Sequence, residues 1–261
     1  MSITKAIDIK KNNLDVQQKE CILSVKNLYI GFGEKQVLKD FNLDLFRGES
    51  LAVLGKSGSG KSVLIKCIIG LLKPDSGEIN VLGNNVSKMK HHELDAMRKK
   101  VGFLFQSNAL YDSMSVKENL EFPLRRHRMF MNEENTIKII KDTLDNVGLL
   151  HTLNMMPSEL SGGMKKRIAL ARTLVLNPEI ILYDEPTTGL DPVTAREISS
   201  LIIDLKNKFN TSSLVISHDM SCVKMTADRI IILLDGKCYA NGTYHDLSCS
   251  SDTNIHQFFK D

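Results

Sequence analysis

The sequence predicts an α/β protein built on a parallel sheet, with a helical insertion. Short apolar segments alternate with helical patterns along the chain, and the segments 179–183 and 212–217 are strongly apolar, as expected for strands buried on both faces. The stretch 107–160 has apolar residues at helical spacing but no strong strand. We therefore expect one α/β domain that carries an inserted helical subdomain.

The expected elements follow one another with turn residues between them. The first twenty residues are polar and are expected to form an extension, and the turn at 73–77 should end the first helix. The expected strands are 21–28, 41–46, 50–54, 100–105, 179–183, 212–217 and 230–234, with a strand and turn at 77–86. The expected helices are 61–72, 165–176 and 192–209, the last with Pro192 at its start.

Within the insertion, apolar residues at helical spacing predict a helix. These residues are Ile137, Ile140, Leu144 and Val147, and Gly148 follows them as a C-terminal cap.

Composition and charge are those of an ordinary globular chain. Of the 261 residues, 42% are apolar and 25% charged, and the net charge of +3 is too small to indicate nucleic-acid binding. The longest apolar run, 230–234, is far shorter than the about 20 residues of a membrane-spanning helix. The N-terminal segment lacks a signal-peptide pattern, and the five cysteines are odd in number and never two residues apart. We therefore expect a cytosolic protein with reduced thiols.

A phosphate-binding loop follows the strand expected at 50–54. The loop has the pattern GxxxxGK[ST] between a strand and a helix and consists of Gly55, Lys56, Ser57, Gly58, Ser59, Gly60, Lys61 and Ser62. Its backbone N–H groups can surround an anion at the start of a helix, Lys61 can reach the β- and γ-phosphates, and Ser62 can bind magnesium. The loop indicates a nucleotide but not the reaction, because kinases and GTPases share it.

Two further features can act on a nucleotide. The buried strand 180–183 runs into Asp184, which can hold magnesium, and Glu185, which can act as a general base on water. Ser161 is an N-cap for the helix after it, and Gly162 and Gly163 leave backbone N–H groups open to an anion. The alternatives are a solvated acid at a strand end and an ordinary capped helix.

Over about 22–247 the chain resembles the ATPases of ATP-binding-cassette (ABC) transporters. LSGGM at 160–164 resembles the family signature LSGGQ, and YDEPTTGLD at 183–191 resembles its Walker B segment and D-loop. Ser217-His218-Asp219 resembles the switch histidine, Gln106 the Q-loop, and Phe32 the aromatic residue that stacks on adenine.

The resemblance implies a P-loop NTPase core with an antiparallel β subdomain and the inserted helical subdomain. It divides the chain into an extension (1–20), an ATPase domain (21–250, with the helical subdomain at 107–160) and a tail (251–261). ATP and magnesium are the implied ligands. Glu185 would polarise water, His218 would contact the γ-phosphate, and Gln106 would contact magnesium and report occupancy to a membrane partner.

The family also implies that two copies sandwich ATP. The phosphate loop of one copy would face Ser161, Gly162 and Gly163 of the other, and the D-loop around Asp191 would cross the seam between them.

Finer signals resemble the Mla/Mce-type lipid-transporter branch. Met164 replaces the usual glutamine of the signature, and the segments 107–125 and 161–195 are similar to that branch. The branch implies a separate membrane permease whose coupling helix meets 107–125, an Mce-domain protein, phospholipid cargo, and a place on the cytoplasmic face of the bacterial inner membrane. An ATPase for another cargo is the alternative. A soluble DNA-repair or translation ATPase is disfavoured, because the chain has one ATPase domain and no heptad run.

Overall fold

The computed structural model describes residues 20–127 and 132–259. The extension expected at 1–20 therefore lies outside the described residues except for Glu20, as do the last two residues of the expected tail. In the part of the chain that is described, no helix combines the length and apolar character needed to span a membrane.

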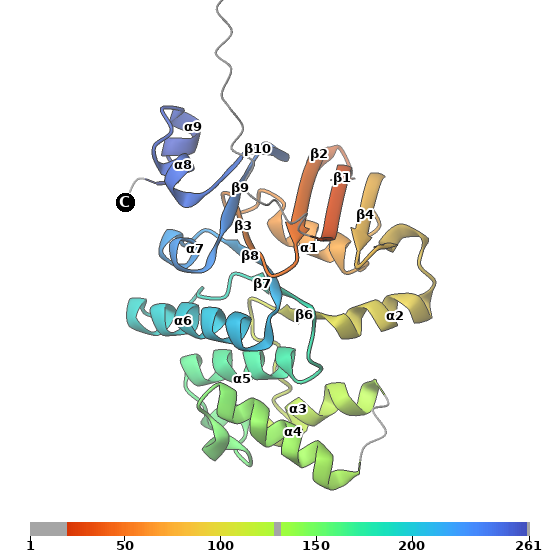
Figure 1. Cartoon of the computed structure of the whole chain (residues 1–261), viewed down its shortest axis with the longest axis vertical. Coiled ribbons are helices and arrows are strands. Elements are labelled where there is room, and N and C mark those ends of the chain that lie inside the picture. Colours follow the sequence, from red (N-terminus) through yellow and green to blue (C-terminus); the bar gives the residue numbers. More distant parts are fainter. Residues whose placement is uncertain (1–19, 128–131, 260–261) are drawn as a thin grey trace, which may run out of the picture.

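Two sheets form the upper and middle layers of the molecule (Figure 1). The first is antiparallel, with the order β2-β1-β4-β5, and contains β1 (Cys21–Phe32), β2 (Lys35–Phe46), β4 (Ser76–Val81) and β5 (Asn84–Asn85). The second has the order β10-β9-β3-β8-β7-β6 and is parallel except at β10; it contains β3 (Ser50–Leu54), β6 (Val101–Leu104), β7 (Ile180–Asp184), β8 (Ser212–Ser217), β9 (Arg229–Leu234) and β10 (Lys237–Gly242). The α/β class, the parallel sheet and the antiparallel sheet are confirmed.

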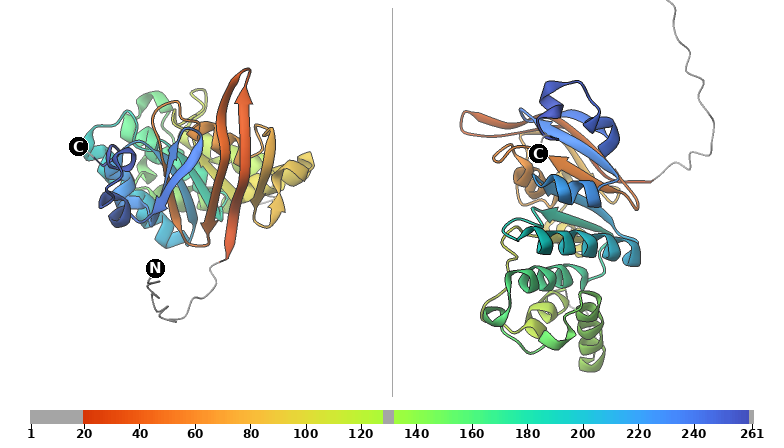
Figure 2. Two further views of the ribbon diagram at one scale, coloured as in Figure 1. Left: turned by 90° about the horizontal axis from the view of Figure 1, so that it is seen from above. Right: turned by 90° about the vertical axis from the view of Figure 1, so that its left-hand side faces the viewer.

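Helices cover the parallel sheet and form the lower end of the molecule in Figure 1. They are α1 (Lys61–Ile68), α2 (His91–Lys100), α3 (Val116–Arg126), α4 (Glu133–Asn146), α5 (Gly162–Leu174), α6 (Pro192–Phe209), α7 (Met220–Thr226), α8 (Tyr244–Ser248) and α9 (Thr253–His256), with 3₁₀ turns at Val86–Lys88, Leu150–Thr152 and Pro157–Glu159. Helix α5 lies between the sheet and the pair α3 and α4, an arrangement also visible in the side view of Figure 2. The helical insertion is thus confirmed.

The central strands are buried on both faces, as their continuous apolar runs predict. In β7, Leu182 belongs to the core shared with α1 and the antiparallel sheet, whereas the next residue, Tyr183, belongs to the core shared with α5 and α6. Leu214 and Val215 of β8 divide in the same way. Each such side chain contributes roughly 1.5–3 kcal/mol by its burial, so the two cores fix the register of the strands that carry the site.

Several helix and strand ends differ from their expected positions. Helix α1 ends at Ile68 rather than at residue 72, because Gly70 adopts a φ of +67° and Leu71 N–H donates to Lys66 O at 2.8 Å. Helix α5 begins at Gly162 rather than at residue 165, directly after its cap. Strand β6 ends at Leu104, before Gln106.

The helix expected around residues 137–147 is present as α4. Its end has the predicted glycine cap, because Gly148 N–H donates to Asp145 O and Leu149 N–H donates to Leu144 O, both at 2.9 Å. Ile140 and Leu144 are buried against residues of α3 and α5. The four C-terminal elements α7, α8, α9 and β10 had no counterpart among the expected elements.

Gly77→Ala is expected to lower the free energy of unfolding by about 3 kcal/mol or more. Gly77 has a φ of +100°, and a Cβ there would overlap the carbonyl oxygen of Asn27 in the neighbouring strand, so strain and steric overlap add. Gly33→Ala is the matched control: its φ is +59°, but no atom lies within 4 Å of the added Cβ. Urea denaturation of both variants measures the difference, and an equal loss in the two would contradict the account.

Candidate nucleotide site

The loop at 55–62 connects β3 to α1 and leaves the start of that helix open. Gly60 occupies the N-cap position with a φ of +106° and provides no side-chain hydrogen bond to the helix. A Cβ on Gly60 would lie 2.7 Å from Val37 Cγ1, so the close approach of β2 also requires glycine. The uncapped N–H groups of the first turn and the positive end of the helix dipole form an anion site.

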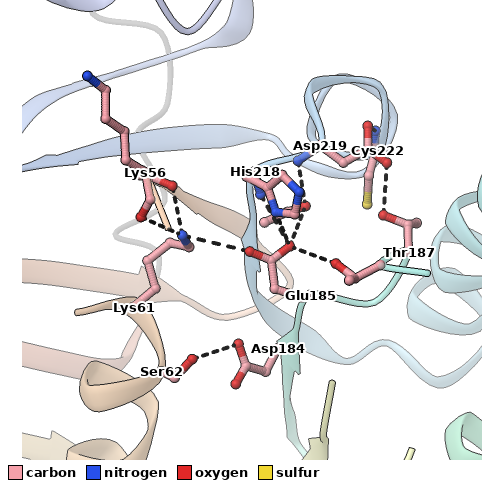
Figure 3. Close-up of polar contacts among 12 residues, drawn as sticks. Lys56, Lys61, Ser62, Asp184, Glu185, Thr187, His218, Asp219 and Cys222 are labelled. Carbon is pink, nitrogen blue, oxygen red and sulfur yellow. Dashed lines mark hydrogen bonds and ion pairs between the residues drawn. The ribbon is translucent and has the colours of Figure 1, made fainter. Parts of the chain in front are cut away.

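Lys61 holds a buried ammonium in the middle of this loop. Its Nζ donates to Gly55 O at 2.7 Å and to Lys56 O at 3.1 Å, and it lies 3.7 Å from Glu185 Oε1 (Figure 3). Burial lowers the pKa of Lys61, while the charges of Glu185 and Asp184 act in the opposite direction. The buried ammonium is thus held within the phosphate loop, beside the cavity in which a polyanion can bind.

Ser62 and Asp184 form an oxygen pair beside the loop. Ser62 Oγ donates to Asp184 Oδ1 at 3.3 Å. Burial raises the pKa of Asp184, and the hydrogen bond from Ser62 opposes that shift. Within 20–127 and 132–259 no group of three or more His, Cys, Asp or Glu residues could hold a metal by itself. The pair therefore fits magnesium, which protein sites usually bind through one or two carboxylates together with substrate phosphates.

Glu185 follows β7 with a strained backbone and a tightly held carboxylate. Its φ is +52°, a left-handed conformation that is costly for a side chain with Cβ and that occurs often at functional sites. Oε2 lies 2.8 Å from His218 Nδ1 and accepts hydrogen bonds from Thr188 Oγ1 and from His218 N–H, each at 3.3 Å. The carboxylate is almost buried, whereas 63% of the His218 side chain is exposed. The local structure therefore fixes one oxygen of Glu185 beside an accessible imidazole.

One cavity of about 420 Å³ brings most of the predicted residues together. Its lining consists of Phe32, Val37, Ser57, Gly58, Gly60, Lys61, Ser62, Val63, Gln106, Glu185 and His218. Phe32 is 52% exposed at this cavity, so its ring is free to stack on a base. The other predicted members of this group, Gly55, Lys56, Ser59 and Asp184, adjoin the cavity through the loop and through Ser62.

The three residues of the signature helix lie apart from this cavity. Ser161 caps α5 by accepting a hydrogen bond from Met164 N–H at 3.2 Å, as predicted. Ser161 and Gly162 are exposed and Gly163 is half-buried, and none of the three lines the cavity. Each copy of the chain thus carries a cavity and, separately, an exposed helix start of the kind that binds anions.

The structure adds three polar contacts that the motifs did not reveal. Thr188 donates to Glu185, Thr187 Oγ1 donates to Asp219 Oδ2 at 2.8 Å, and Lys166 Nζ donates to Gln106 O at 3.1 Å. The two threonines lie within the run at 183–191 and could have been noted as hydroxyls next to acids. The partner of Thr188, Glu185, lies three residues away in that run. The folding of distant segments brings Asp219 to Thr187 and Gln106 to Lys166, and no local pattern specifies those two partners.

The fold and this geometry define an ATP-binding cassette, and comparison with known families agrees. The family model described as "ABC transporter" matches residues 38–188. The chain belongs to this family and is one of its ATP-hydrolysing subunits.

Particular relatives are more informative than the family. The chain is 41% identical over 240 residues to the intermembrane phospholipid transport system ATP-binding protein MlaF of Haemophilus influenzae, which covers 92% of this chain and 90% of that protein. It is 34% identical over 252 residues to the methionine import ATP-binding protein MetN of Campylobacter jejuni, covering 91% of this chain and 75% of that protein. A dimeric post-hydrolysis structure of the ATP-binding cassette MJ0796 with ADP and Pi is similar with a TM-score of 0.77 and 34% identity, covering 85% of this chain and 98% of that one.

Proposed function

We propose that this chain is the ATPase subunit that powers phospholipid transport through a separate membrane permease. The observation that carries the ATPase part is the single cavity lined by Phe32, Lys61, Gln106, Glu185 and His218. The phospholipid part is supported by the similarity to MlaF along nearly the whole of both chains. Transport of another small molecule is the alternative, because the methionine importer is also similar.

Two copies of the chain act together on ATP. In each copy the cavity contains a phosphate loop but no signature residue, whereas Ser161, Gly162 and Gly163 form an exposed helix start. A second copy placed head to tail brings its helix start to the triphosphate, with Asp191 and the D-loop at the seam. The dimeric state of MJ0796 supports this arrangement.

Within each site the residues have separate roles in phosphoryl transfer. The N–H groups of 55–62 and the Lys61 ammonium bind the phosphates, and Phe32 stacks on adenine. The Glu185 carboxylate accepts a proton from the water that attacks the γ-phosphorus, while the bond from that phosphorus to the ADP oxygen breaks. His218, 2.8 Å from Oε2, contacts the γ-phosphate and keeps the carboxylate in place. Magnesium bound by Ser62, Asp184 and Gln106 would neutralise charge that develops on the phosphates.

The chain depends on partners for transport. The permease's coupling helix contacts the segment 107–125, next to Gln106, so that occupancy of the site is conveyed to the membrane. We place the complex on the cytoplasmic face of the bacterial inner membrane, with an Mce-domain lipid-binding protein on the opposite side and no nucleic-acid partner. The similarity to MlaF supports this placement.

Thr188→Val is expected to lower kcat about tenfold with little change in ATP affinity. The variant removes the hydroxyl that donates to Glu185 Oε2, a hydrogen bond to a charged group that contributes about 1.5–3 kcal/mol when it is made. Steady-state kinetics and ATP titration of the assembled transporter separate kcat from binding. A variant with unchanged kcat would show that Thr188 does not orient the carboxylate.

Reconstitution tests the proposed cargo. The chain is assembled with its membrane permease in liposomes that contain a fluorescent phospholipid, and ATP-dependent movement of that lipid is measured. We expect movement that is lost in Glu185→Gln. Hydrolysis stimulated by an amino-acid-loaded binding protein, without lipid movement, would instead establish the alternative cargo class.

A further inference from the structure

The backbone after Gln106 is strained at two consecutive residues. Asn108 has a φ of +63° and Ala109 a φ of +50°, and neither is glycine. Residues with a Cβ adopt this conformation at a cost and keep it only where their surroundings hold them. Asn108 Oδ1 is also buried without a hydrogen-bond partner among the described residues. Some other part of the fold must therefore hold this loop, the segment 106–109, in place.

Lys166 of α5 holds one end of the loop. Its side chain is buried, with a relative exposure of 1%, and Nζ donates to Gln106 O at 3.1 Å. Burial lowers the pKa of Lys166, and the charge of Asp184 opposes that shift. A buried ammonium is unfavourable unless it is hydrogen-bonded, so the contact with Gln106 matters to both partners.

Arg172, on the same helix, holds the other end. Its Nη1 donates to Ala109 O at 2.7 Å and its Nη2 to Asn108 O at 3.1 Å, so one guanidinium binds both strained residues. The guanidinium carbon also lies 5.7 Å from the centre of the Tyr111 ring, within the range of a cation–π contact. Two cations of one helix thus bind three carbonyl groups of the loop.

The same helix begins with the residues that complete the partner's site. Ser161, Gly162 and Gly163 form the start of α5, and Lys166 follows within the next turn. A helix is stiff over this length, so a displacement of the loop that carries Gln106 also acts on the helix start. The contacts of Lys166 and Arg172 with the loop therefore connect the nucleotide cavity of one chain to its own helix start at Ser161, and they involve no residue of the sheet.

We propose that Lys166 and Arg172 are positioning residues that clamp the 106–109 loop to α5, set the position of the Gln106 side chain at the magnesium site, and link that site to the helix start at Ser161. The contacts that clamp the loop belong to the folded chain, whereas the effect on magnesium binding rests on the role proposed for Gln106. Neither cation lines the nucleotide cavity, so both act through the loop and not on the substrate.

Hydrogen exchange in the full chain without nucleotide tests the clamp directly. Asn108 N–H, bonded to Phe105 O at 3.1 Å, reports on the loop. In Lys166→Met this amide is expected to exchange at least about tenfold faster, because a charge-assisted hydrogen bond is lost. The control is Lys165→Met, which removes the same charge from the neighbouring, half-buried position. Equal exchange in the two variants would overturn the clamp.

Thermal unfolding separates positioning from simple stabilisation. Lys166→Met removes the desolvation cost of a buried ammonium and leaves the carbonyl group of the exposed Gln106 open to water, so we expect this variant to keep its melting temperature while the loop loosens. Arg172→Lys keeps the charge but loses the two-pronged contact and should also accelerate exchange at Asn108. A lowered melting temperature with unchanged exchange at Asn108 would assign both residues to stability alone.

Magnesium-dependent ATP binding tests the link to the site. A fluorescent ATP analogue is titrated into the full chain with and without Mg²⁺. Lys166→Met should require several-fold more Mg²⁺ than Lys165→Met and bind the analogue equally well in EDTA; an unchanged Mg²⁺ requirement would overturn the link. Gln106→Ala is measured in parallel: if it too leaves the Mg²⁺ requirement unchanged, the role proposed for Gln106 is wrong, and the exchange result alone decides on the clamp.

Discussion

Glu185→Gln is expected to slow ATP hydrolysis by about 10²–10⁴-fold and to leave ATP binding intact, the usual effect of removing a general base. The amide has the same shape as the carboxylate and can occupy the same position beside His218 and Thr188, which lie 2.8 Å and 3.3 Å from Oε2. It cannot accept a proton from water at neutral pH. The geometry of the site therefore survives and only the chemical step is lost.

Phosphate release by the assembled transporter and equilibrium binding of ATP measure the two effects separately. Glu197→Gln is the matched control, because Glu197 is an exposed carboxylate of α6 that pairs with Arg167 at 2.8 Å, away from the cavity. Its hydrolysis should equal that of the parent protein. Near-normal turnover in Glu185→Gln would remove the role proposed for this residue.

Lys61→Ala is expected to weaken ATP binding by roughly 10²–10³-fold. No binding should then be detectable at ATP concentrations that saturate the parent protein. Removal of one partner of a buried, hydrogen-bonded charge contact costs about 2–5 kcal/mol. The variant also leaves Glu185 without the cation that lies 3.7 Å from its Oε1, so the local charge becomes more negative where the phosphates must bind.

Isothermal titration with ATP and Mg²⁺ measures this loss in the full chain, and circular dichroism checks the fold. Lys73→Ala is the control: Lys73 is exposed in the turn that follows α1, so this variant removes the same charge away from the phosphate loop. It should bind ATP as the parent does. Retained ATP affinity in Lys61→Ala would show that the loop amides alone suffice.

Local sequence signals predicted the elements whose ends are marked by capping residues, proline or turns. Helix α6 has its expected ends because Asp191 caps it, Pro192 starts it and Asn210 ends it in the left-handed conformation. Strand β3 also has its expected ends, since all five of its residues are buried between a turn and the phosphate loop. The residues at the ends of these two elements determine where each element begins and ends, so the sequence pattern was sufficient to predict them.

Elements with weak amphipathic patterns were missed for physical reasons. Helix α2 is rich in charged residues and buries only Met97 of its sequence HHELDAMRKK, so tertiary contacts and not periodicity define it. Strand β10 is an edge strand without a fully buried residue. Its place depends on pairing with β9, which a local pattern cannot specify.

The residues of the site likewise fall into those that the sequence pattern identified and those whose contacts depend on the fold. The phosphate loop, Asp184 and Glu185 were recognisable because the residues of each motif are adjacent in sequence. The contacts of Lys166 with Gln106 and of Thr187 with Asp219 join residues far apart in the chain and follow only from the fold. The role proposed for Ser161 in the site of a second copy was indicated only by the resemblance to the family, because the contacts within one chain do not specify it.

The most direct test of the account is a cryo-electron microscopy structure of the Glu185→Gln chain with its membrane subunits, ATP and Mg²⁺. We expect two copies of the chain closed around ATP, with Ser161 and the N–H groups of Gly162 and Gly163 at about 3 Å from the triphosphate held by the other copy's phosphate loop. A triphosphate bound by residues 55–62 of one copy, with the other copy's Ser161 out of reach of it, would contradict the shared site.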